Sequence, residues 1–155
     1  MKARWITFLP HMEKIIKRCE VCNMAMVDAD NMPYVVPMNF GYKEGVIYFH
    51  GDPNGKKMDI LRKNANVAIS FSTDHQLSKQ NEDVACSYSM NYRSVFAKGE
   101  VYFIEDYDKK VEALNIIMAN YTEGEFSYNS PAVTNVAVFA VKVDEFTAKE
   151  FGRFV

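Results

Sequence analysis

The sequence lacks any long apolar run. No segment approaches the ~20 consecutive apolar residues that a membrane-spanning helix needs, and the opening MKARWITFLPHMEKII has no continuous apolar stretch of the signal-peptide kind. We therefore expect a cytoplasmic protein with no membrane partner. The formal net charge is only -2, which provides neither a basic field for nucleic acid nor an acidic tail. No nucleic-acid partner is expected.

Cysteine is also scarce, with three residues in the chain, and this usage favours a reducing compartment. Cys19 and Cys22 form a CxxC, a spacing that elsewhere binds zinc or exchanges disulfides. A structural zinc site normally takes four ligands. No second paired spacing occurs among the other candidates, which are His11, His50, His75 and Cys86. We predict buried free thiols and no metal, with a metal or redox function as the alternative.

The 155 residues fit one domain, 1–155, that can bury its own core. Aromatic residues make up 14% of the chain and there are nine methionines, a composition that suits a flat ligand pocket or a dimer interface.

Periodicity predicts the elements of the first half of the chain. Pro10 opens a short amphipathic helix whose apolar positions include Met12, Ile15 and Ile16. Further along, we expect strands at 21–28, 34–42 and 46–50, a helix at 56–63 and an apolar strand at 67–71. The polar segment 72–83 has the composition of a solvent-exposed loop.

In the second half, strand character returns at 85–90 and 92–104, with Gly99 expected at a bulge. Asp106 is expected to cap a helix that ends at Gly124, followed by a loop at 125–135 and a last strand at 136–146. The links between strands are short, which favours antiparallel pairing. The expected fold is therefore mainly β, a mostly antiparallel barrel with peripheral helices.

Residues 34–57 form the most informative segment, a hairpin of apolar strands that leads into a basic turn. Pro37 lacks an amide hydrogen, which predicts an irregular or edge strand with backbone groups available to a ligand. Lys56 and Lys57 follow Gly55 at a helix start, where open amides and the helix dipole favour a phosphate. These features predict a site for a planar, phosphorylated ligand, and a solvated lysine pair is the alternative.

A nucleotidase phosphate loop is a poor match to GDPNGKK. That motif needs four residues between its glycines and Ser or Thr after the lysine, whereas here three residues intervene and Lys57 follows. Ser94, in YRSV, has neither a glycine elbow nor a histidine motif nearby, which argues against a serine hydrolase. It remains a candidate hydroxyl donor to phosphate. His50 ends an apolar strand and either donates to a bound ring or is a hydrogen-bonded structural histidine.

Taken together, VPMNFGY, GVIYFH, GKK, VAISF and YRSVFAKGEVYFIED resemble the pyridoxamine 5'-phosphate oxidase-like flavoproteins, in particular their nitroimidazole-resistance (Nim) branch. The resemblance runs from about Cys19 to the helix at Asp106, and more loosely to the last strand. It implies a split β-barrel homodimer that binds FMN at the subunit interface and acts on a small molecule.

The resemblance also implies a set of cofactor-binding residues. Those matching the first flavin-contacting strand are Val36, Pro37, Met38 and Asn39. The ring-proximal position matches His50, followed by Gly51, and the phosphate pair matches Lys56 and Lys57. The strand position that carries a glutamine in the oxidases is Ser94 here, followed by Val95.

The same resemblance argues against oxidation of pyridoxamine phosphate itself. The oxidases carry a tryptophan and an arginine near the C-terminus, whereas the only tryptophan here is Trp5 and the tail reads FTAKEFGRFV. We expect an FMN-dependent oxidoreductase, with nitroaromatic reduction suggested by the Nim branch and His50 as the candidate proton donor. The alternatives are a non-catalytic flavin or haem binding protein and a metal-binding domain built on the CxxC.

Overall fold

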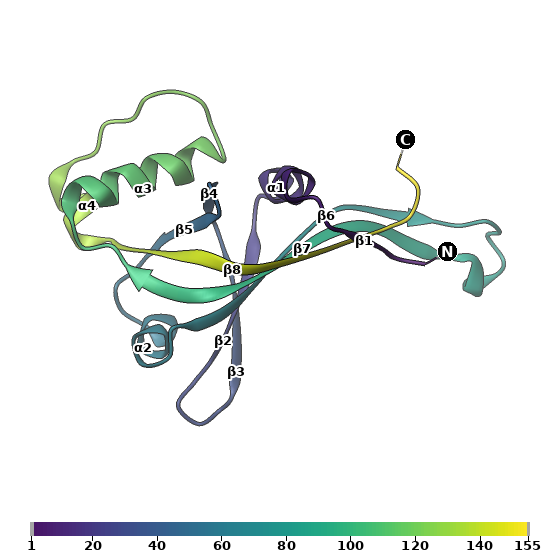
Figure 1. Cartoon of the computed structure of the whole chain (residues 1–155), viewed down its shortest axis with the longest axis horizontal. Helices are drawn as coiled ribbons and strands as arrows, with labels where there is room; N and C mark the ends of the chain where they lie inside the picture. Colours follow the sequence, from purple (N-terminus) through teal and green to yellow (C-terminus); the bar gives the residue numbers. More distant parts are fainter. Residues whose placement is uncertain (1, 155) are drawn as a thin grey trace.

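The computed structural model describes residues 2–154 and places eight strands in one sheet, in the order β3-β2-β6-β7-β8-β5-β4, with β1 paired to β8 (Figure 1). The strands are β1 Arg4–Ile6, β2 Cys22–Val27, β3 Pro33–Met38, β4 Gly41–Lys43, β5 Val46–Gly51, β6 Asn66–Ser78, β7 Ser89–Phe103 and β8 Ala137–Phe151. All the neighbouring pairs run antiparallel. The expected mostly antiparallel β fold with peripheral helices is confirmed.

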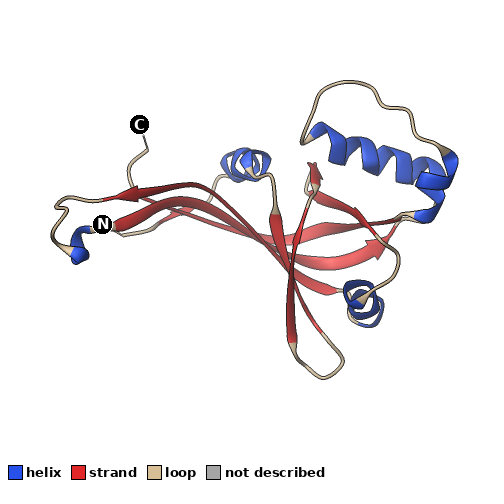
Figure 2. Cartoon of the chain, turned by 180° about the vertical axis from the view of Figure 1, so that it is seen from behind, coloured by secondary structure: helices blue, strands red, loops and turns tan. Residues whose placement is uncertain are grey.

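Within residues 2–154, four α-helices and one short 3-10 helix lie around the sheet (Figure 2). They are α1 Leu9–Arg18, α2 Lys56–Lys63, η1 Ala85–Ser87, α3 Tyr107–Ala119 and α4 Ser130–Asn135. Helix α1 packs against β6 and β7, and α3 packs against β4 and β5. Figure 1 shows α2 on the side of the sheet opposite α3, close to the ends of β2 and β6.

The first helix and the two cysteines are placed as the sequence predicts. Pro10 stands in the first turn of α1, whose buried residues are Met12, Ile15 and Ile16. Cys19 and Cys22 are free, buried thiols. Burial raises the pKa of the Cys19 thiol to about 11 and that of the Cys22 thiol to about 12, so both are protonated and unreactive near neutral pH.

Aromatic side chains fill the centre of the core. Phe40, Phe49, Phe71 and Phe139 are fully buried. The rings of Phe40 and Phe71 meet edge to face at 4.9 Å between centroids, and those of Phe49 and Phe139 stack at 5.5 Å. The Phe49–Phe139 pair packs β5 against β8, and the Phe40–Phe71 pair packs the segment before β4 against β6. This packing fixes the positions of the strands that carry the candidate site.

The polar segment 72–83 is not a loop throughout, and that prediction is wrong. Strand β6 continues to Ser78 and pairs with β7 as an arm that projects from the body of the molecule (Figure 2). A register shift lies between Thr73 and Gln76, and Asp74 adopts a positive φ of 58° there. Pairing with β7 supplies the backbone hydrogen bonds that a polar composition alone does not predict.

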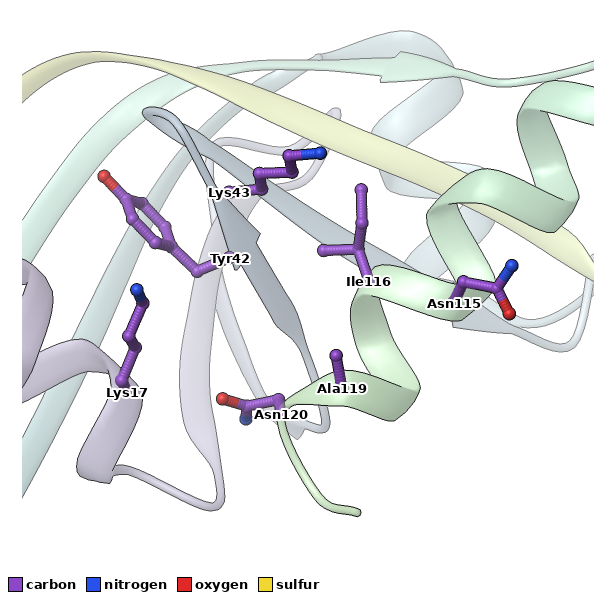
Figure 3. Close-up of a pocket in the computed structure, with 7 residues that line it drawn as sticks. All are labelled: Lys17, Tyr42, Lys43, Asn115, Ile116, Ala119 and Asn120. Atoms are coloured by element: carbon purple, nitrogen blue, oxygen red, sulfur yellow. The ribbon is translucent and has the colours of Figure 1, made fainter. Parts of the chain in front are cut away.

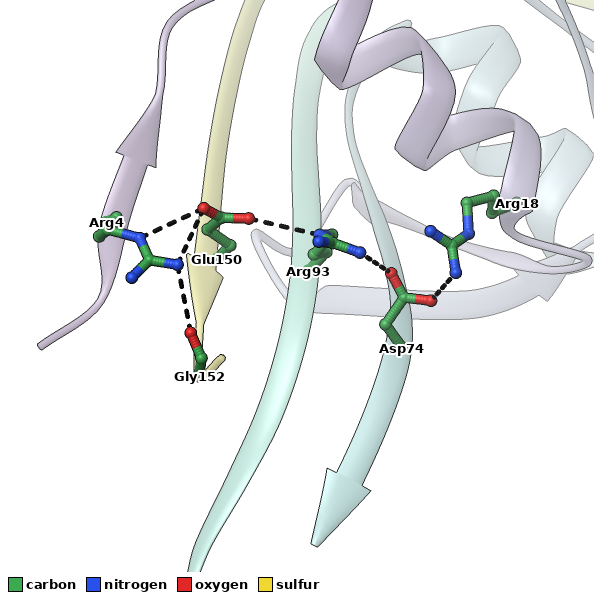
Figure 4. A network of polar contacts seen from close by, with 6 residues as sticks. All are labelled: Arg4, Arg18, Asp74, Arg93, Glu150 and Gly152. Atoms are coloured by element: carbon green, nitrogen blue, oxygen red, sulfur yellow. Dashed lines mark hydrogen bonds and ion pairs between the residues drawn. The ribbon is translucent and has the colours of Figure 1, made fainter. Parts of the chain in front are cut away.

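A ladder of alternating charges crosses the sheet at the base of this arm (Figure 4). Arg93 donates to Asp74 at 2.8 Å and to Glu150 at 3.3 Å, and Arg4 pairs with Glu150 at 3.1 Å. Arg18 of α1 binds the other oxygen of Asp74. The ladder links β1, β8, β7, β6 and α1, so Arg93 is a structural cation at its centre.

The C-terminal half confirms two predictions and corrects two others. The register of β7 against β8 shifts at Gly99, and the Asp106 side chain caps α3 by accepting from the Lys109 amide at 3.0 Å. Helix α3 ends at Ala119, short of Gly124, and the loop predicted at 125–135 contains α4. The buried Lys110 ammonium donates to carbonyls at the end of α4, with 2.8 Å to Val136. This tertiary bond favours a helix that local sequence does not predict.

Candidate functional site

Strands β3 and β5 and helix α2 meet at one corner of the molecule. The Lys57 ammonium lies 3.5 Å from the Met38 sulfur, which joins the start of α2 to the end of β3. A Cβ placed on Gly51 would lie 3.4 Å from the same ammonium, so the end of β5 also reaches this point. The fold therefore brings together three residues that were predicted from separate parts of the hairpin segment: Met38, Gly51 and Lys57.

The N-terminus of α2 is open. Its N-cap residue is Gly55, with φ 102°, and no side chain caps the amides of the first turn. Lys56 and Lys57 are the first two residues of the helix. Unfilled amides, the positive end of the helix dipole and two ammonium groups make this corner a fitting site for a phosphate group.

Two neighbouring contacts fix the loop before α2. The Asp52 carboxylate accepts from the Asn54 amide at 2.8 Å, and Arg62 of α2 donates to the Pro53 carbonyl at 2.7 Å. The Lys56 ammonium lies 4.6 Å from the centroid of the Tyr34 ring, on β3. Tyr34 was not predicted as a residue of the candidate site. Its position at the start of the hairpin segment 34–57 is the only sequence signal that could have indicated it.

The electrostatics of the corner favour an anion. Burial, and then the charge of Lys57, lower the pKa of His50 below its ordinary value of 6.5. Burial also lowers the pKa of Lys57, while Asp52 opposes that shift. His50 is therefore neutral near pH 7, with one ring nitrogen able to donate and the other able to accept. A bound anion would stabilise the charged form of the partly desolvated Lys57 ammonium.

The predicted flavin-contacting strand lies at an edge of the sheet. β3 is the terminal strand of the order and pairs only with β2 within the described chain, where Pro37 stands opposite Asn23. The expected edge position of Pro37 is confirmed. Val36 packs against the core, Met38 is buried, and Asn39 follows the strand with its amide 3.4 Å from the Tyr121 hydroxyl.

Ser94 and Val95 stand on β7, which β2 and β6 separate from β3 in the sheet order. Val95 is buried in the core at 1% exposure. Ser94 lies instead beside a hollow of about 330 Å³ on the outer face of the sheet, together with Trp5 and Phe96.

This outer face carries large exposed apolar side chains. Trp5 is 64% exposed, Val35 56% and Phe96 37%. Trp5 on β1 and Phe96 on β7 line the same hollow, whereas Val35 stands apart on the edge strand β3. Exposed apolar residues grouped on a sheet face are typical of surfaces that bind another protein.

A second, larger hollow of about 530 Å³ lies between α1, β4 and α3 (Figure 3). It is lined by Lys17, Tyr42, Lys43, Asn115, Ile116, Ala119 and Asn120. None of these residues was predicted as a site residue, because they come from three distant segments and follow no recognisable spacing.

Two features of the described residues bear on other functions. In residues 2–154, no group of three or more His, Cys, Asp or Glu side chains is arranged to hold a metal ion. Over the same range, none of the helices combines the length and apolar content needed to cross a membrane.

Comparisons with known proteins give the same family as the site residues suggest. Residues 11–150 match the family profile described as pyridoxamine 5'-phosphate oxidase. A crystal structure from Bacteroides thetaiotaomicron, of a protein assigned to 5-nitroimidazole antibiotic resistance, is similar at 45% identity and a TM-score of 0.88. The match covers 97% of this chain and 89% of that one. The comparison with curated proteins gave no match.

More distant structures share the fold. The flavocytochrome Anf3 from Azotobacter vinelandii is 19% identical with a TM-score of 0.81, over 97% of this chain and 70% of that one. An FAD and heme binding protein from Mycobacterium smegmatis is 18% identical with a TM-score of 0.84, over 97% and 74%. The sheet is thus the split barrel expected from the sequence. The profile match and the 45% identity establish that the chain belongs to the pyridoxamine 5'-phosphate oxidase family.

Proposed function

We propose that the chain is a flavoprotein that binds FMN and transfers electrons to a small molecule. The observation that carries this proposal is the open N-terminus of α2, where Lys56 and Lys57 adjoin an uncapped first turn next to Met38 and Gly51. A phosphate is the group that such a corner binds best. Flavin-binding proteins of the same fold support a flavin as the rest of the ligand.

The residues present fit the two parts of FMN. Lys56, Lys57 and the first-turn amides of α2 would hold the phosphate, and Val36, Pro37, Met38 and Asn39 on the edge of the sheet would hold the ring. A bound flavin supplies hydride or electron transfer at its N5 atom, and the protein positions the ring and tunes its potential. β3 pairs only with β2 within the described residues, so the backbone groups on its other side are free to bind a ligand.

His50 would stand at the rim of this site, next to Gly51. Since the pKa of His50 is lowered, the neutral ring would act near pH 7 as a hydrogen-bond donor to the flavin or substrate. A phosphate at Lys57 would offset the positive charge that contributes to this shift, and His50 would then be better able to carry and deliver a proton.

The second half of the site would come from another copy of the chain. Ser94 and Val95 stand on β7, which is not a neighbour of β3 in the sheet, and the exposed apolar residues Trp5, Val35 and Phe96 offer a surface for association. We propose a homodimer in which Ser94 of one subunit faces the flavin held by the other.

Nitroaromatic reduction is the proposed activity. It is supported by the 45% identity to a protein assigned to 5-nitroimidazole resistance. A second candidate is a non-catalytic flavin or haem carrier, since two proteins of the same fold are described by their binding of both flavin and haem.

An absorption spectrum of the purified protein, followed by FMN titration, tests the proposal. We expect quenching of FMN fluorescence at one site per chain, and oxidation of NADH or NADPH when a 5-nitroimidazole is added. A protein that binds neither FMN nor FAD would refute flavin binding. Tight flavin binding without any nitroimidazole reduction would favour the carrier, and a Soret band after haem addition would identify its second ligand.

A further inference from the structure

The Tyr121 hydroxyl lies at the end of the strand that carries the proposed ring contacts. Tyr121 comes two residues after the end of α3. Its oxygen is 3.1 Å from the Phe40 amide nitrogen and 3.4 Å from the side-chain nitrogen of Asn39. Asn39 and Phe40 directly follow β3, before β4 begins. The fold therefore places a phenol from the second half of the chain beside the edge strand.

The single proton of this hydroxyl has a partner of its own. Tyr121 donates to the Glu20 carbonyl at 2.6 Å, the shortest of its three contacts. A phenol has only one hydrogen to donate, and its oxygen accepts otherwise. Since the proton is committed to Glu20, the oxygen can only accept from Phe40 and Asn39. The backbone N–H of Phe40 is a donor in any case, so the three contacts agree with one another.

This arrangement fixes the orientation of the Asn39 amide. The two ends of a carboxamide look alike, and their hydrogen-bond partners decide which is which. Because the Tyr121 oxygen accepts, the NH2 group of Asn39 faces it and the carbonyl Oδ1 is at the other end. The Asn39 side chain is exposed and makes no other hydrogen bond within residues 2–154. Oδ1 is therefore an open acceptor of fixed orientation at the edge of the sheet.

An acceptor is unusual at this corner of the molecule. The other polar groups there are donors: the Lys57 ammonium, beside Met38, and the open first-turn amides of α2. The oxidised flavin ring carries one N–H group, at N3, between two carbonyl groups. Binding sites orient a ligand through a few placed polar groups. A fixed acceptor next to the ring strand suits that one N–H.

We propose that the Asn39 Oδ1 atom accepts a hydrogen bond from the flavin N3–H, and that Tyr121 is the positioning residue that presents this oxygen. The inference rests on the proposed function, since it names a ring contact of that same site. Without the phenol oxygen, the Asn39 amide is free to turn and can bring its NH2 group against N3–H, donor facing donor. Tyr121 thus governs selection for a flavin with a hydrogen at N3.

FMN and 3-methyl-FMN test the contact, because a methyl group replaces the N3 hydrogen and the phosphate is unchanged. Fluorescence titration should show 3-methyl-FMN binding about tenfold or more weakly than FMN in the original protein. Tyr121→Phe should weaken FMN binding severalfold and bring the two affinities closer together. Tyr128→Phe is the matched control, because that hydroxyl also binds an asparagine, Asn115, at 2.9 Å. It should leave the ratio of affinities unchanged.

Variants of Asn39 separate positioning from a structural effect. Asn39→Ala should reduce the preference for FMN as Tyr121→Phe does, and the double variant should show no further change in the ratio, since both act through one contact. Asn39→Asp presents an acceptor oxygen at either end. Its preference for FMN should therefore survive the addition of Tyr121→Phe, a rescue that a purely structural hydroxyl would not produce.

The outcomes distinguish this inference from the proposed function. Equal affinities of the original protein for FMN and 3-methyl-FMN would overturn the N3 contact and leave FMN binding in place. A protein that binds neither compound would overturn both. If Tyr121→Phe weakens both compounds equally and lowers the thermal midpoint, the hydroxyl serves the fold and the positioning role is wrong.

Discussion

The Lys57 ammonium lies 3.5 Å from the Met38 sulfur, and this contact joins the first turn of α2 to an edge strand. A thioether is a weak acceptor, so most of the hydrogen-bonding capacity of the ammonium is left for another partner. The Lys57 ammonium is partly desolvated by burial, which lowers its pKa. An anion at this corner would therefore stabilise Lys57 as well as fill the open amides of α2.

The two lysines should matter for the phosphate of the cofactor and little for its ring. Charge-assisted hydrogen bonds contribute roughly 1.5 to 3 kcal/mol each. Lys56→Ala with Lys57→Ala should therefore weaken FMN binding by about a hundredfold or more, measured by fluorescence quenching. Riboflavin lacks the phosphate and should bind almost unchanged. Equal losses for FMN and riboflavin would show that the lysines hold the fold or the ring instead, and Lys14→Ala with Lys63→Ala is the charge-matched control.

The charge of Lys57 should be visible in the titration of His50. The positive charge disfavours protonation of the imidazole, so Lys57→Met should raise the pKa of His50 towards its ordinary value of 6.5. Burial is the larger cause and stays in place, so the rise should be partial. NMR titration of the imidazole in the two proteins measures it, with Lys63→Met as a control. A pKa that falls or stays constant in Lys57→Met would contradict the coupling.

The outer face of the sheet should control subunit association. Phe96 is 37% exposed on β7, beside the hollow that contains Ser94. A carboxylate there would have to be desolvated in an interface, so Phe96→Glu should convert a dimer into a monomer and weaken FMN binding with it. Sedimentation and FMN titration measure both effects. Phe126→Glu, at 38% exposure in the loop after α3, is the matched control. A Phe96→Glu protein that is still dimeric and binds FMN normally would rule out this interface.

The charge ladder should make stability depend on pH. Burial raises the pKa of Glu150, but hydrogen bonds from Arg4 and Arg93 outweigh it and leave the pKa below its ordinary value of 4.5. A lowered carboxylate pKa contributes stability above the unfolded value, and that contribution is lost as the pH falls through the folded value.

Arg93→Met removes the central cation and leaves Asp74 and Glu150 without it. We expect a loss of about 2 kcal/mol in the free energy of unfolding at pH 7, from urea titration, because the pairs are partly buried. The loss should shrink as the pH falls below 4.5 and through the lowered folded pKa of Glu150, where this carboxylate gains its proton. As a control, Lys79→Met removes the exposed ion pair with Glu82 and should change the free energy of unfolding little. If the loss of unfolding free energy in Arg93→Met does not change with pH, the cause is lost packing and not the lost ion pairs.

Short-range patterns explain what was predictable. Helix α2 begins at Lys56 and ends at Lys63 as expected, since the glycine before it and the apolar spacing within it are local signals. The edge position of Pro37 follows from its missing amide hydrogen. The contact of Lys57 with Met38 is tertiary, and no local spacing indicates it.

Features that depend on distant partners were not predictable. The polar residues 72–78 become a strand because β7 pairs with them and because Arg18 and Arg93 meet Asp74. Helix α4 depends on the buried Lys110 ammonium at its end. The hollow around Asn120 gathers residues from α1, β4 and α3, and no local spacing indicates such a site.

Strand β8 pairs with β1, β7 and β5, so strands from both ends of the chain share it. During synthesis on the ribosome, β5 has no access to this partner until residues 137–142 have emerged, and β1 has none until residues 148–150 have emerged. Before β8 emerges, β4 can pair with β5, and β2, β3, β6 and β7 can pair in their final order, but the two groups of strands are not yet joined. We expect folding to be largely post-translational and sensitive to chaperone supply, because contacts of such long sequence separation form slowly.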